Sequence, residues 1–143
     1  MGKPVAVVTG ASSGIGAATA IALAAAGYDV VLGARRVDKL RDVAQRIGDA
    51  GGTAIVMELD VTDQAAVDAL AAEVASCDVL VNNAGGALGM ESVEGAVEDK
   101  WRWMYEVNVL GTLRVTRALL PALKAAKGAV ITIGSIAARQ NYP

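Results

Sequence analysis

The feature that most constrains the fold is a regular alternation between short apolar runs and longer segments with helical periodicity. The predicted strands are the β-branched runs 5–10, 29–34, 53–61, 78–85 and 129–135. The predicted helices are 15–27, 38–52, 63–76 and 96–128, the last bent near Asn108 or Gly111. An unbroken β-α order with right-handed crossovers predicts an α/β protein with a doubly wound parallel sheet and helices on both faces.

Composition agrees with a sheet that is buried on both faces. Hydrophobic residues make up 54% of the chain without counting glycine, whereas ordinary domains reach ~45–50% with glycine included. Strands of covered parallel sheets are apolar throughout, which accounts for the excess. The length of 143 residues predicts one domain, 1–143.

Charge and cysteine content exclude several function classes. A net charge of −2 gives no reason to expect a nucleic-acid or membrane partner. The single cysteine, Cys77, allows no internal disulfide, and without histidine we expect no metal site. We find no signal-like start and no apolar run of the ~20 residues that a membrane span needs. We therefore expect a cytoplasmic protein.

The loop "TGASSGIG" (9–16) joins the first predicted strand to the first predicted helix. Glycines there permit a tight turn and a close approach of backbone to a pyrophosphate, and the helix N-terminus offers free N–H groups. The predicted cofactor contacts in this loop are Gly10, Ser12, Ser13, Gly14, Ile15 and Gly16. The alternative is a glycine-rich turn in which serine caps the helix.

The end of the second predicted strand, "GARR" (33–36), indicates which dinucleotide would bind. A site for NAD needs a carboxylate here to hold the ribose 2′-hydroxyl, but Ala34 stands there, followed by Arg35 and Arg36. Arginine can hold a 2′-phosphate bidentately, which favours NADP(H). The alternative is that both arginines form a solvated loop face.

Polar residues also follow the third and fourth predicted strands. Asp60 can accept a hydrogen bond from an adenine amino group, with Val61 against the ring, or it can be a polar neighbour of Thr62. Thr62 is the predicted N-cap of the helix 63–76. Asn82 and Asn83 end an apolar strand, and buried amides need partners, so we expect them to bond loop backbone or a ligand.

The last predicted strand runs into Ser135, and Tyr142 follows seven positions later. The strand-end position marks Ser135 as a candidate site residue. Tyr142 precedes Pro143 and is predicted to be an extended loop residue.

"TGASSGIG", "LDV", "NNAG", Asn108 and "ITIGSIAA" occur here in the order found in the short-chain dehydrogenase/reductase family, and the chain resembles that family along essentially its whole length. The resemblance implies a Rossmann fold, three-layer α/β/α, with strand order 3-2-1-4-5. It implies that NADP(H) contacts the glycine loop, Arg35, Asp60, Val61, Asn83, Ala84 and Gly85. Members use an Asn, Ser, Tyr and Lys tetrad, of which Asn108 and Ser135 match the first two.

The activity that this resemblance implies is hydride transfer between NADP(H) and a small hydroxyl or carbonyl substrate. The segment "LVNNAGGALGMESVEGAVEDKW" resembles the NADP-dependent 3-hydroxy acid dehydrogenases more narrowly, which implies a 3-hydroxy acid. The family's Tyr-x-x-x-Lys pair should begin after Pro143, so we expect an N-terminal part of a longer enzyme. The alternative is a dinucleotide-binding module without catalysis.

The predicted helix 96–128 carries large apolar residues at Trp101, Met104, Leu119 and Leu123. They either pack in the core or, as the resemblance implies, contribute to a homodimer or homotetramer.

Overall fold

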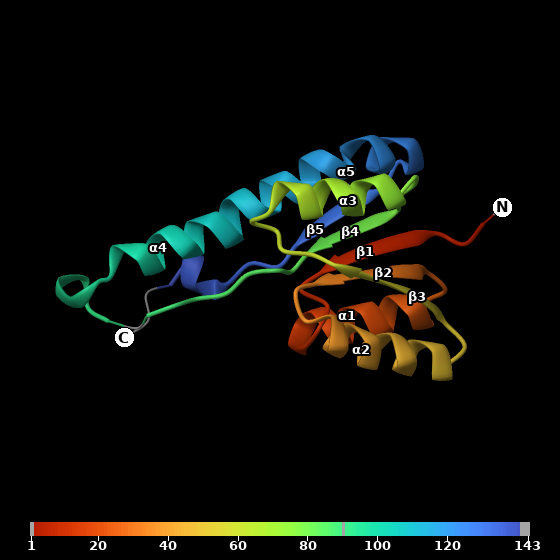
Figure 1. The fold of residues 1–143 in the computed structure, drawn as a ribbon, viewed down its shortest axis with the longest axis horizontal. Helices are drawn as coiled ribbons and strands as arrows, with labels where there is room; N and C mark the ends of the chain where they lie inside the picture. The colour runs from red at the N-terminus through yellow and green to blue at the C-terminus, as the bar shows by residue number, and fades with distance from the viewer. Residues whose placement is uncertain (1, 90, 141–143) are drawn as a thin grey trace.

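The computed structural model describes residues 2–89 and 91–140. Within them a five-stranded parallel sheet has the order β3-β2-β1-β4-β5 (Figure 1). The elements are β1 (Val5–Thr9), α1 (Gly14–Ala25), β2 (Asp29–Ala34), α2 (Val37–Asp49), β3 (Thr53–Glu58), α3 (Gln64–Glu73), β4 (Val79–Asn82), α4 (Glu98–Tyr105), α5 (Thr112–Ala126) and β5 (Ala129–Thr132). Short 3-10 helices cover Val93–Gly95 and Ile136–Ala138. The predicted strand order is confirmed.

Helices cover both faces of the sheet (Figure 1): α1 and α2 lie on one side, and α3 and α5 lie on the other. Successive side chains of a strand point to opposite faces. Val7 accordingly belongs to the hydrophobic cluster under α3 and α5, and Val8 belongs to the cluster under α1 and α2. The doubly wound architecture is therefore confirmed, with two apolar layers of similar make-up.

At one helix end the sequence prediction is confirmed, and at another it is wrong. Gly27 follows α1 with φ +96°, and Tyr28 N–H donates to the carbonyl of Leu23 at 3.1 Å, the expected glycine termination. The prediction that Thr62 caps α3 is wrong. Asp63 occupies the N-cap and accepts from the N–H of Ala65 at 3.0 Å.

The long predicted helix 96–128 is divided in three. A π-helical segment, Glu106–Gly111, separates α4 from α5, and it contains both residues near which a bend was expected. Figure 1 shows α4 reaching past the sheet on the side of the strands' carboxyl ends. Leu119 and Leu123 of α5 are buried, but Trp101 of α4 is 62% exposed, so the core-packing alternative fails for Trp101.

β5 is one of the two edge strands of the sheet, the other being β3, and the residues of β5 are exposed. Cys77 is buried before β4, and desolvation raises the pKa of its thiol to about 11. No helix in residues 2–89 and 91–140 is long and apolar enough to cross a membrane.

Candidate active site

A cavity of about 820 Å³ opens beyond the carboxyl ends of β1 to β4. The chain leaves β1 toward one side of the sheet and reaches β4 on its other side, which makes this the switch point where ligands bind in such folds. The predicted site residues on the lining are Gly10, Ser12, Ser13, Ile15, Arg35, Arg36, Asp60, Val61, Asn83, Ala84 and Gly85. Gly14, Gly16, Asn108 and Ser135 lie outside that lining.

The glycine loop is packed too closely for side chains at two of its positions. A Cβ atom at Gly10 would lie 2.8 Å from Nδ2 of Asn83 and 2.9 Å from Cα of Ala84. A Cβ atom at Gly16 would overlap the carbonyl oxygen of Gly10 and the amide of Asn83. A Cβ atom at Gly14 would meet no atom within 4 Å. Glycine is favoured there because the backbone has a φ of +55°, which residues with side chains rarely adopt. Glycine at positions 10 and 16 therefore lets this loop and the start of α1 pack directly against the loop after β4.

A buried threonine joins the glycine loop to the loop after β4. Thr9 is 1% exposed, and its Oγ1 accepts from the N–H of Asn83 at 3.0 Å and of Ala84 at 2.9 Å. Asn83 Nδ2 donates back to the carbonyls of Thr9 and Gly10, at 3.1 and 3.2 Å. Thr9 was not among the predicted site residues, although a polar residue ending a buried strand was a usable signal.

The side chain of Asn82 points to the face of the sheet that α5 covers, away from the glycine loop. It is 4% exposed, and its Nδ2 donates to Thr116 Oγ1 of α5 at 2.9 Å. Asn83 thus bonds loop backbone as expected, but Asn82 bonds a side chain of α5 instead of loop backbone or a ligand; both buried amides have partners, as the cost of burying them requires.

Arg36 points to the glycine loop. Its Nη2 donates to Ser13 Oγ at 2.8 Å and to Ser12 Oγ at 3.2 Å. Ser13 occupies the N-cap position of α1 but makes no side-chain capping bond, so its hydroxyl faces the arginine rather than the helix. The arrangement gathers one cation and two hydroxyls on the cavity wall, a donor set that suits an anion.

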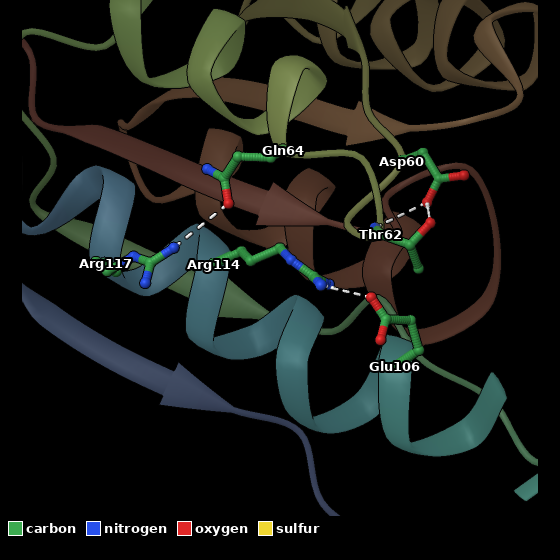
Figure 2. A network of polar contacts seen from close by, with 6 residues as sticks. All are labelled: Asp60, Thr62, Gln64, Glu106, Arg114 and Arg117. Carbon is green, nitrogen blue, oxygen red and sulfur yellow. Dashed lines mark hydrogen bonds and ion pairs between the residues drawn. The ribbon is translucent and has the colours of Figure 1, made fainter. Parts of the chain in front are cut away.

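Asp60 and Thr62, which follow β3, form a neighbouring part of the cavity wall. Asp60 Oδ1 accepts from Thr62 Oγ1 at 2.7 Å and from Thr62 N–H at 2.9 Å (Figure 2). The hydroxyl bond lowers the pKa of Asp60 below its ordinary value of 3.8, the backbone bond and the charge of Arg35 add to this, and partial burial opposes it. Asp60 is therefore an ionised acceptor at neutral pH.

Asn108 clamps the loop that follows the cavity residues of β4. Its Nδ2 donates to the carbonyl of Gly86 at 2.8 Å, and its Oδ1 accepts from the N–H of Gly86 at 2.9 Å. A Cβ atom at Gly85 would lie 2.5 Å from Asn108 Oδ1, so the glycine makes this contact possible. Asn108 thus acts on the site through backbone, from the π-helical segment.

Ser135 lies in an exposed stretch after β5, and its Oγ accepts from the N–H of Ala137 at 3.1 Å. Tyr142 lies outside the described residues.

One side of the cavity comes from residues that were not predicted. They lie on α4 and on the start of the π-helical segment: Arg102, Trp103, Tyr105, Glu106 and Val107. The ring of Trp103 lies over Gly86, 3.2 Å from where a Cβ would be. Nothing in the sequence placed this helix across the strand ends. In the part of the chain that the structure describes, no group of His, Cys, Asp or Glu side chains could hold a metal ion.

A doubly wound parallel sheet with a glycine loop at its switch point defines the Rossmann class of nucleotide-binding proteins. The model of the short chain dehydrogenase family matches residues 4–143, and the chain belongs to that family. The family resemblance read from the sequence is thereby confirmed.

Named relatives and solved structures resemble this chain over nearly its whole length. An uncharacterised oxidoreductase of Mycobacterium tuberculosis is 59% identical over 141 residues, 98% of this chain and 54% of the relative. An NADP-dependent 3-hydroxy acid dehydrogenase of Schizosaccharomyces pombe is 38% identical, over 95% of this chain and 55% of that protein. A metagenomic short-chain oxidoreductase solved with NADP is 42% identical with a TM-score of 0.90, over 97% of this chain and 65% of that one. The chain spans about half the length of the curated relatives it matches.

Proposed function

We propose that this chain binds NADP(H) and supplies the nucleotide-binding part of an oxidoreductase that transfers hydride to or from a small hydroxyl or carbonyl compound. The observation that carries the proposal is the convergence of Arg36 with Ser12 and Ser13 on the cavity wall. Ala34 stands at the end of β2, where a site for NAD would place a carboxylate. The metagenomic oxidoreductase was solved in complex with NADP, which agrees with this choice.

The residues present fit such a cofactor in three places. Because Ser13 makes no side-chain capping bond, the first backbone N–H groups of α1 are available for the pyrophosphate. Arg36 and Arg35, with Ser13, would hold the 2′-phosphate. Bonds to charged groups contribute ~1.5–3 kcal/mol, which corresponds to roughly ten- to a hundredfold in affinity.

The adenine ring of the cofactor would contact the part of the cavity wall that follows β3. The ionised Asp60 would accept from the adenine amino group, and Val61, 6% exposed, would lie against the ring. Asn83, Ala84 and Gly85 would pass beside the rest of the cofactor, held in place by Thr9.

When bound, the nicotinamide supplies or accepts the hydride. Ser135 would hold the substrate oxygen where charge develops, and Asn108 keeps the loop at Gly86 in place. The 143 residues contain no Tyr-x-x-x-Lys sequence. We propose that the acid–base pair comes from beyond residue 143. The alternative, a dinucleotide-binding module without catalysis, predicts NADP binding with no turnover.

For the substrate we propose a 3-hydroxy acid. Support comes from the Schizosaccharomyces pombe relative, which is named for that activity. Formation of NADPH with a panel of 3-hydroxy acids and simple secondary alcohols tests this. Turnover confined to the simple alcohols would contradict the substrate but not the cofactor.

We also propose that the chain forms a homo-oligomer through the outer face of α4 and α5. Trp101, Val109 and Leu113 are 62, 48 and 53% exposed and lie off the cavity, and Tyr105, 57% exposed, falls in the same four-residue spacing but also lines the cavity. Contiguous apolar exposure of this kind marks interaction surfaces.

Calorimetric titration with NADP and NAD tests the cofactor. Arg36→Gln should weaken NADP binding by roughly ten- to a hundredfold and leave NAD binding unchanged, because only NADP carries the 2′-phosphate. Arg35→Gln should act in the same direction. Arg41→Gln, an exposed arginine of α2 away from the cavity, is the matched control. Equal losses for NADP and NAD in the Arg36 variant would contradict the role.

A further inference from the structure

Gly111, the last residue of the π-helical segment, is buried against the nucleotide cavity's wall. A Cβ atom at this position would lie 2.6 Å from Cγ2 and 3.0 Å from Cβ of Val61. Real Cβ atoms do not approach other atoms so closely, so any residue larger than glycine must push the two elements apart. Val61 cannot easily yield, because a β-branched side chain that is 6% exposed has little rotamer freedom.

The same segment reaches the site at two other points. Its first residues, Glu106 and Val107, line the cavity together with Val61. Asn108, at its centre, holds both backbone groups of Gly86. A shift of the segment away from Val61 would therefore move a cavity wall and the Asn108 clamp together.

The segment is tied to α5, which favours movement as a unit. Glu106 forms an ion pair with Arg114, two turns further on (Figure 2). Thr112 Oγ1 donates to the carbonyl of Asn108 at 2.9 Å across the junction with α5. A displacement at Gly111 is therefore passed on rather than absorbed within one turn.

We propose that Gly111 is a positioning residue: its missing side chain seats the π-helical segment against Val61 and thereby sets both the adenine side of the cavity and the Asn108–Gly86 clamp. The inference rests on the proposed NADP function for its effect on binding. Its effect on the clamp does not depend on any ligand.

The test is a double-mutant cycle in the full-length protein with Gly111→Ala, Val61→Ala and both together. Gly111→Ala should weaken NADP binding roughly tenfold and lower the hydrogen-exchange protection of the Gly86 amide by a similar factor. Val61→Ala removes the overlapping Cγ2 atom, so adding Gly111→Ala to the Val61→Ala variant should cost little more of either quantity than Val61→Ala costs alone. Gly48→Ala, in α2 with no atom within 4 Å of the added Cβ, is the matched control.

The outcomes separate the two proposals. Wild-type protein that does not bind NADP, with the Gly86 amide still responding to Gly111→Ala, contradicts the function and supports the positioning role. A Gly111→Ala loss that is as large in the Val61→Ala background as in wild type, or an unchanged Gly86 amide, overturns the positioning role. If Gly111→Ala does not fold, Val61→Ile adds a methyl group at the same contact, and it should reproduce both effects.

Discussion

At the scale of single residues, the ionisation of Asp60 is set by a neighbour two positions along the chain. The hydroxyl and N–H of Thr62 both donate to Oδ1, which stabilises the carboxylate over the acid. A group whose folded pKa is depressed contributes stability above its unfolded pKa. That contribution is lost as the pH falls through the folded pKa, so the relevant window lies below the ordinary value of 3.8.

Replacing Thr62 with valine should raise the pKa of Asp60 toward its ordinary value, because the largest stabilising contact disappears while the side-chain volume is kept. The free energies of unfolding of variant and wild type should differ at neutral pH and converge in strong acid. NMR titration of the Asp60 carboxyl carbon and urea unfolding measure the two effects. Thr53→Val, at an exposed threonine of β3, is the control. An unchanged pKa would show that Thr62 is not the cause.

The sequence predicted residues that line the cavity where the chemistry of a single position was informative. Gly10 and Arg36 were predicted because a turn beside a phosphate needs glycine and a 2′-phosphate needs a cation. The partner of Arg36 could not be read, because its contact with Ser13 joins residues 23 positions apart. Both Thr62 and Asp63 carry a side-chain oxygen that could cap α3. The sequence could not show that Asp63 would do so while the hydroxyl of Thr62 bonds Asp60.

At the scale of elements, the glycine loop contains two glycines needed for different reasons. Gly14→Ala should cost ~1–2 kcal/mol, the strain of a left-handed residue with a side chain, since nothing surrounds its Cβ. Gly16→Ala should cost more and abolish NADP binding, because the new Cβ overlaps the Gly10 carbonyl and the Asn83 amide. Urea unfolding and NADP titration of both variants measure this. Equal effects would refute the packing role of Gly16.

Two adjacent leucines test how α5 holds the sheet. Leu119 is 1% exposed and belongs to the core cluster, whereas Leu120 is 41% exposed. Leu119→Ala should lower the free energy of unfolding by ~2–5 kcal/mol through lost burial and a cavity. Leu120→Ala should change it by less than about 0.5 kcal/mol. Similar losses from chemical unfolding would mean that α5 faces the sheet differently.

At the scale of the whole molecule, the outer face of α4 and α5 should set the association state. Leu113→Glu places a charge on the exposed apolar stripe and should lower the molar mass found by light scattering, while NADP affinity stays unchanged because Leu113 lies off the cavity. Ile55→Glu, an exposed apolar residue of β3 outside the stripe, is the control. Equal masses for Leu113→Glu and wild type would remove the stripe as an interface.

The sequence alone determined the layers, the strand order expected from family resemblance, and the glycine loop, since these follow from local periodicity and from residues that have one conformational use. It did not determine the far wall of the cavity. Trp103 lies on α4, and Glu106 and Val107 begin the π-helical segment, which contacts Val61 at Gly111, 50 residues further along the chain. Only the tertiary structure brings such distant segments into contact, because packing between elements is not encoded in the pattern of either one.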